Sequence, residues 1–258
     1  MEPQTPSESI QTEDTKPRNF FSRLSGVYFS PGETFKEIGR SPNVLMPIIF
    51  LIVIGTLVGY FMSQKVDVGS MMSEQLEQAV AEGKITQEQA DQQVAVMSRF
   101  GQYQLVVGSG LGNLIIALAI AGVFKLLSLF IGAENRFKTV FSVTLYALIA
   151  VFLVQYIVTS VILYFKSPGE LNFASLTSLV ASNLGALIAS LLGEDALPKY
   201  LMRLFSWIDI FAIWIIALLS IGYAAVSRKL TTSTAAVWLG GTYVVIALIG
   251  SALGGLFS

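Results

Sequence analysis

The chain of 258 residues is far more apolar than a soluble protein, with 53% hydrophobic residues, 13% charged residues and a mean hydropathy of +0.67. This composition is typical of a protein with several membrane spans and excludes a soluble enzyme. The net charge of −1 gives no basic field for nucleic acid, and no stretch of Lys and Arg is dense enough to predict specific capture of acidic lipids. Because cysteine and histidine are both absent, thiol and imidazole chemistry is excluded, and we expect no cofactor and no metal.

The first 43 residues are polar and precede the first apolar run. Residues 1–18 contain three prolines, many Ser and Thr and almost no apolar side chains, which predicts a disordered cytoplasmic tail. Residues 19–43 mix aromatic and basic side chains with helix-start signals, including a capping box of Ser30 with Glu33. They predict short amphipathic juxtamembrane helices that lie against the membrane or the helix bundle.

Five apolar stretches are each long enough to cross a hydrocarbon core of about 30 Å. The predicted spans are about residues 44–63, 104–132, 139–165, 203–227 and 232–257. The fold class is therefore all-α, a polytopic membrane helix bundle with five transmembrane helices in a domain of residues 44–258. A tight polar turn makes the second and third spans antiparallel neighbours.

Two stretches between the spans have a different character. Residues 69–100 predict an outer helical hairpin, because an apolar stripe at helical spacing stops at Gly83 and resumes after Thr86, which forms a capping box with Gln89. Residues 171–192 carry no charge but several Ser and Asn residues among their leucines. Their apolar residues keep helical spacing on one side, which favours an interfacial or re-entrant helix over a sixth span.

The distribution of basic residues predicts the orientation of the spans. Ten of the 16 Lys and Arg residues fall on the side of the N-terminus, and the short turns between spans lie only on that side. By the positive-inside rule we expect a cytoplasmic N-terminus and an outside C-terminus. A sixth span would place Arg228 and Lys229 outside and would conflict with this bias.

Three polar residues predicted at a similar membrane depth form the candidate site. Asp209 begins the pattern Asp209-x-Phe211-x-x-Trp214, and an Asp at the centre of a span costs on the order of 2.5–3.5 kcal/mol, so it should avoid lipid tails. At about 1.5 Å per residue, Asn113 and Gln155 lie at a comparable distance from the outer boundary, so the three side chains can converge. They would form either structural hydrogen bonds or a substrate or ion site. The predicted spans contain no second carboxylate, and we expect no catalytic residue.

Pairs of glycines four residues apart give three spans a face of small residues, which is typical of close helix packing. The pairs are Gly55 with Gly59, Gly108 with Gly112, and Gly250 with Gly254. This spacing does not distinguish packing within one chain from packing between two copies.

Three passages carry a resemblance to a known family. They are SPGETFKEIGRSP before the first span, RFKTVFSVTLYAL at the start of the third, and DIFAIWIIALLSIGYAAVS, which contains Gly222, in the fourth. Over about residues 20–257 the chain resembles the prokaryotic branch of the Yip-domain family, membrane proteins named for eukaryotic Ypt/Rab-interacting proteins. The resemblance implies a five-span helical domain with a cytoplasmic N-terminus in a prokaryotic cytoplasmic membrane.

The resemblance also bears on partners. Eukaryotic members of this family act in vesicle trafficking by binding small GTPases and other membrane proteins. This sequence lacks the acidic, tyrosine-bearing motif that those members carry before their first span, which argues against a GTPase partner.

The sequence thus predicts a non-enzymatic membrane scaffold or adaptor in membrane organisation or trafficking-like processes. Its expected partners are the lipid bilayer and other membrane proteins or further copies of itself. The alternative is a small-solute transporter or channel that uses Asp209. Against that alternative, the chain shows neither an internal repeat nor a paired Gly/Pro interruption of its spans.

Overall fold

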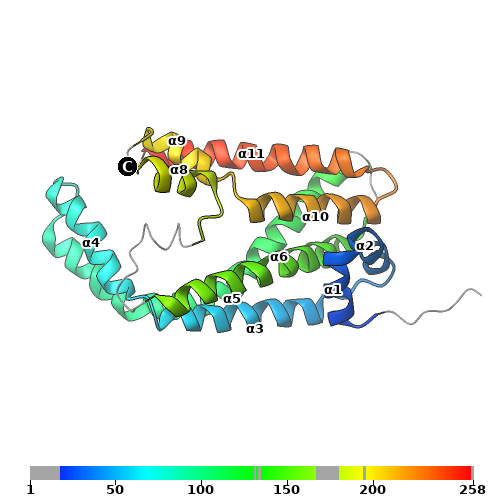
Figure 1. Cartoon of the computed structure of the whole chain (residues 1–258), viewed down its shortest axis with the longest axis horizontal. Coiled ribbons are helices and arrows are strands. Elements are labelled where there is room, and N and C mark those ends of the chain that lie inside the picture. The colour runs from blue at the N-terminus through cyan, green and yellow to red at the C-terminus, as the bar shows by residue number, and fades with distance from the viewer. Residues whose placement is uncertain (1–17, 131, 133–134, 167–179, 194–195, 257–258) are drawn as a thin grey trace, which may run out of the picture.

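Figure 1 shows a computed structural model of the chain, which describes residues 18–130, 132, 135–166, 180–193 and 196–256. The predicted disordered tail lies outside the described residues except for Arg18, and so do residues 171–179 of the predicted interfacial helix. Within the described ranges every regular element is a helix. The helices are α1 (Phe20–Phe29), α2 (Pro31–Arg40), α3 (Leu45–Ser63), α4 (Val68–Ala81), α5 (Gln87–Phe130), α6 (Phe137–Phe165), α8 (Leu184–Leu192), α9 (Lys199–Ser206), α10 (Ile210–Val226) and α11 (Thr232–Leu256).

The long helices form two layers that meet at α6. Helices α3, α5 and α6 pack against one another, while α10 and α11 form an antiparallel pair, of which α10 packs on α6 (Figure 1). Helices α1 and α2 lie at one end of the bundle, and α4 projects from the opposite end along the first part of α5 (Figure 1).

In the part of the chain that the structure describes, four helices are long and apolar enough to cross a membrane, and their spanning parts are Leu45–Ser63, Phe100–Phe130, Phe137–Phe165 and Thr232–Ala252. Helix α10 is equally apolar but has 17 residues, which corresponds to about 26 Å. The prediction of one continuous span over residues 203–227 is therefore wrong: the chain ends α9 at Ser206 and begins α10 at Ile210.

The hairpin and the second span share one helix. Helix α5 runs unbroken for 44 residues, so the predicted boundary between a hairpin ending at residue 100 and a span beginning at residue 104 does not exist. The turn before α5 has the predicted capping box, in which the Thr86 backbone N–H donates to Gln89 and the Gln89 N–H donates to Thr86 Oγ1, at 2.9 and 3.2 Å. The other predicted box is absent, because the Ser30 side chain caps nothing.

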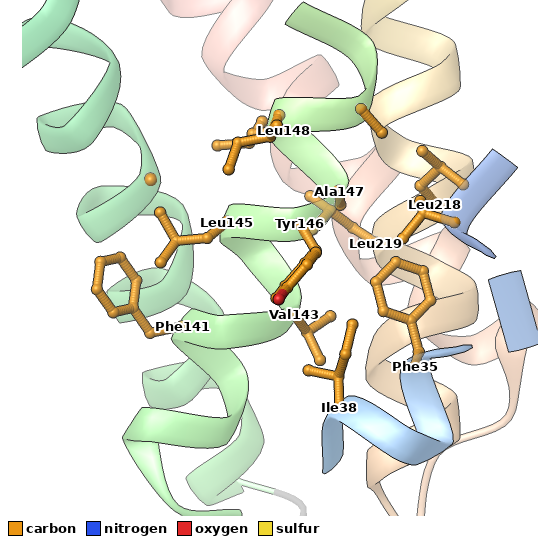
Figure 2. Packing of buried hydrophobic residues seen from close by; sticks show 14 of the residues in the cluster. Phe35, Ile38, Phe141, Val143, Leu145, Tyr146, Ala147, Leu148, Leu218 and Leu219 are labelled. Carbon is orange, nitrogen blue, oxygen red and sulfur yellow. The ribbon is translucent and has the colours of Figure 1, made fainter. Parts of the chain in front are cut away.

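The core is densest where α6 meets the N-terminal helices and α10. Phe35 and Ile38 of α2 are fully buried; Ile38 lies beside Val143 of α6, and the Phe35 ring points toward Leu218 and Leu219 of α10 (Figure 2). A Cβ placed on Gly222 of α10 would lie 2.5 Å from Val143 Cγ1 and 3.3 Å from the Phe35 ring, so only glycine allows this approach. Helix α2 therefore packs on the bundle, and its burial resolves the alternative between the membrane surface and the bundle.

An ion pair holds α1 to α2. Arg23 is only 3% exposed, and its Nε donates to Glu37 at 3.1 Å while its Nη1 donates to the Ser41 carbonyl at 2.8 Å. Arg18 binds the same carboxylate. Tyr28 donates its hydroxyl to the Ala150 carbonyl at 2.6 Å, which joins α1 to the middle of α6.

Candidate intramembrane polar site

Asp209 lies at the interruption of the predicted fourth span, and its side chain explains the interruption. Its Oδ1 accepts the backbone N–H groups of Phe211 and Ala212 at 2.8 and 3.0 Å, which makes it the N-cap of α10. Asp is among the residues that most favour this position, because a helix begins with backbone N–H groups that have no partner in the helix. The negative charge also lies at the favourable end of the helix dipole.

The segment just before α8 forms hydrogen bonds with the interrupted backbone between α9 and α10. Ser182 donates its hydroxyl to Asp209 Oδ2, and the two segments pair as an isolated antiparallel bridge. Leu184 N–H donates to the Ile208 carbonyl at 2.9 Å, and Ile210 N–H donates to the Ser182 carbonyl at 3.0 Å. These bonds replace the helical ones that the backbone gives up between α9 and α10, as a chain inside a bilayer requires.

Helix α8 begins at the same place. Asn183 is its N-cap, and its Oδ1 accepts the Ala186 N–H at 2.8 Å. The N-termini of α8 and α10 therefore meet at the bridge, each capped by its own side chain. Of residues 171–192, the structure describes 180–192, in which α8 is a helix of nine residues with only Gly185 buried.

A cavity of about 360 Å³ lies beside the bridge, and all three predicted site residues line it. Its lining comes from α3, α5, α6 and the two irregular segments: Val58, Met62, Asn113, Phe152, Gln155, Tyr156, Thr159, Val180, Ser182, Asn183 and Asp209. The structure thus brings Asp209, Asn113 and Gln155 to one place, although no hydrogen bond joins two of them among the described residues.

The three residues are held in different ways. Asn113 Nδ2 donates to the Ser109 carbonyl and to the Tyr156 hydroxyl, which ties α5 to α6. Gln155 makes no hydrogen bond within the described ranges, so its side-chain amide can form hydrogen bonds with a molecule bound in the cavity. The site can accept and donate hydrogen bonds to a small polar molecule. Among the described residues no group of three or more Asp and Glu side chains is placed to hold a metal ion.

The predicted glycine pairs differ in whether they pack against a neighbouring helix. A Cβ on Gly55 would lie 2.6 Å from the Ser109 carbonyl oxygen, and one on Gly59 would lie 2.3 Å from that of Leu105, so both pack against the backbone of α5. Gly108 and Gly112 do not take part in this contact.

The remaining glycines show the same range of environments. A Cβ on Gly108 would meet only Gln104 of its own helix, and one on Gly112 would meet nothing within 4 Å. A Cβ on Gly250 would lie 3.0 Å from the nearest atom of the Trp207 ring, so this glycine packs on that ring. The surroundings of Gly254 lie outside the described residues.

Sequence reasoning missed three contributors. Gly110 is the residue of α5 that meets α3, since a Cβ there would lie 2.8 Å from the Ile52 carbonyl oxygen. Tyr156 could have been found from the sequence, because a hydroxyl inside a span needs a hydrogen-bond partner and Tyr156 directly follows Gln155, a predicted site residue. Ser182 was not, because its partner is 27 residues away along the chain.

Comparison of the chain with known protein families gives one match. The Yip1 domain matches residues 25–254, which is most of the chain. No curated protein and no solved structure matches significantly. Members of the matched family are generally non-enzymatic membrane proteins. The chain belongs to the Yip1 domain family and is a multi-pass integral membrane protein.

Proposed function

We propose that the protein is a non-enzymatic scaffold or adaptor that organises the membrane by binding other membrane proteins or further copies of itself. The observation that carries this proposal is that two of the polar residues at the candidate site form hydrogen bonds within the fold. Asp209 caps α10 and binds Ser182, and Asn113 joins two helices, so both are engaged in holding the fold. We also infer that the chain belongs to the prokaryotic branch of the family and lies in a prokaryotic cytoplasmic membrane without a GTPase partner.

The proposal is supported by surfaces that remain open on the spans. Ile115 of α5 is 65% exposed and Val237 of α11 is 71% exposed. Gly112 lies on α5 near such exposed positions, and a Cβ added to it would meet nothing within 4 Å among the described residues. Small residues let two membrane helices approach closely, so this part of α5 suits contact with another membrane protein.

The test is photo-crosslinking of the full-length protein in native membranes. A photoreactive residue at Ile115 should give adducts of defined mass with another protein or a second copy, whereas the same group at buried Leu145 should give internal products only. Adducts with lipid alone at Ile115, and at Val237 when tested in the same way, would contradict the scaffold role.

A small-solute transporter or channel is the second candidate, and one observation favours it. The cavity lies where two irregular segments meet between helix ends, and transporters commonly bind substrates at interrupted helices. Gln155 lines the cavity without a partner among the described residues, so Gln155→Leu should abolish flux into proteoliposomes while leaving the fold intact. Ile115→Leu, on the exposed face of α5, is the control. An absence of flux across common ions and metabolites would eliminate this candidate.

A further inference from the structure

The turns at the end of the bundle that carries α1 and α2 form a second cavity, of about 480 Å³. Its lining includes the cationic side chains of Lys36, Arg40, Arg136 and Arg228, and no acidic side chain among the described residues. These cations come from three separate stretches of sequence: the last turns of α2, the residue before α6, and the turn between α10 and α11. No stretch of the sequence is dense in Lys and Arg, and the fold brings these four cations together.

Most of this charge is not neutralised within the described part of the chain. Lys36 pairs with Glu33 at 2.9 Å, but Arg40, Arg136 and Arg228 have no ion pair there, and all three are exposed. Four cations that converge on one cavity repel one another unless an anion lies between them. The arrangement is therefore most favourable with a bound anion.

Two further features point to an anion with oxygen acceptors. The side-chain Nδ2 of Asn135 is buried and has no hydrogen-bond partner, and Asn135 lines the cavity. Its backbone carbonyl is held in place by Lys125 Nζ at 2.6 Å. Helix α6 begins beside it with no side-chain cap, so its first backbone N–H groups and its dipole also favour an anion.

We propose that this cavity binds the phosphate group of an anionic phospholipid. A phosphate supplies the charge and the acceptors that three arginines, one amide and a helix N-terminus require. The source is a lipid because the cavity lies at the ends of α6, α10 and α11, where a bilayer places its headgroups. The volume is within the range of small-ligand sites. This inference does not depend on the scaffold role.

The experiment measures thermal unfolding of the full-length protein in neutral detergent during titration with dioctanoyl phosphatidylglycerol or dioctanoyl phosphatidylcholine. The anionic lipid should raise the melting temperature saturably, and the zwitterionic lipid should not. Arg136→Gln and Arg228→Gln should each weaken the apparent affinity about fivefold, and the double variant more. Lys138→Gln is the matched control, since Lys138 is exposed near the start of α6 but does not line the cavity.

Three outcomes would overturn the proposal. Equal responses to the two lipids would show that there is no site for an anionic headgroup. An equal loss of affinity in Lys138→Gln and Arg136→Gln would show attraction by general surface charge. A third arm uses sodium phosphate at matched ionic strength: stabilisation by phosphate as large as that by the lipid would assign the cavity to a soluble anion. Without added ligand, no variant should melt below the wild type, because the substituted side chains are exposed and the loss of an arginine from the cavity reduces repulsion among the cations.

Discussion

At the scale of single residues, Asp209 joins three parts of the fold. It begins α10, it binds Ser182, and it lies in the bridge that replaces helical hydrogen bonds between α9 and α10. A charge that looks unfavourable in a continuous span is therefore well placed at a helix N-terminus, where it accepts two backbone N–H groups.

The first prediction concerns this cap. Asp209→Asn should change the free energy of unfolding by less than about 0.5 kcal/mol, because Asn caps helices nearly as well as Asp. Asp209→Leu should cost about 1–2 kcal/mol, since it removes the cap and leaves the Ser182 hydroxyl without its partner. Thermal unfolding in detergent measures both. A Leu variant as stable as the wild type would show that the cap contributes nothing.

The second prediction concerns Glu37, outside the membrane. Burial raises its pKa, but hydrogen bonds from Arg18 and Arg23 outweigh that effect and hold the pKa below its ordinary value of 4.5. The stability that the Glu37 carboxylate contributes through Arg18 and Arg23 is therefore complete above pH 4.5, and it is lost as the pH falls through the lowered pKa of Glu37.

The measurement follows from this sign. Melting temperatures of the wild type and of Glu37→Gln should differ most near neutral pH, and the difference should shrink below pH 4.5. Subtracting the variant removes the contribution of the other carboxylates. A difference that stays constant down to about pH 3 would contradict the role of the Glu37 carboxylate.

At the scale of elements, the contact between α3 and α5 depends on glycines that the two helices contribute unequally. Gly55 and Gly59 of α3 face the backbone of α5. On α5, the glycine that packs against α3 is Gly110, and not Gly108 or Gly112. The spacing of the glycine pairs therefore predicted the packing face of α3, whereas Gly108 and Gly112 of α5 show no close helix packing among the described residues.

The third prediction separates those faces with the same substitution. Gly59→Ala should cost about 1–3 kcal/mol, because its Cβ would lie 2.3 Å from a carbonyl oxygen and the helices must move apart. Gly112→Ala should leave the monomer as stable or slightly more stable, because nothing lies within 4 Å and alanine favours the helix. Thermal unfolding of the purified monomer measures both. Equal effects would contradict the α3–α5 contact.

At the scale of the whole molecule, the two ends of the bundle differ in character. One end carries α1, α2 and the basic cavity, and the other carries the projecting hairpin of α4 and α5 (Figure 1). From the distribution of Lys and Arg and the positive-inside rule, we propose that the first end faces the cytoplasm.

The fourth prediction tests this orientation. Because the chain has no cysteine, single cysteines report their own position without background. A membrane-impermeant maleimide should label Lys84→Cys at the turn of the hairpin in intact spheroplasts, and should label Lys138→Cys and Arg228→Cys only after the membrane is opened. Labelling of the last two from outside would invert the proposed topology.

The sequence was enough to predict an all-helical membrane protein and four of its long apolar helices, because long apolar runs are local properties that packing does not change. It also identified Asp209, Asn113 and Gln155 as residues of comparable depth, which follows from the rise of a helix. It predicted α2 as an amphipathic helix without identifying the surface that α2 covers.

How these parts meet follows from contacts between residues far apart along the chain. The interruption before α10 depends on Ser182 and the bridge, which are distant along the chain, so periodicity alone predicted a continuous span. The basic cavity cannot be found in the sequence, since Arg40 ends α2, Arg136 precedes α6 and Arg228 lies in the turn after α10, far apart along the chain. Charges act through space, and only the folded chain brings these three arginines around one cavity.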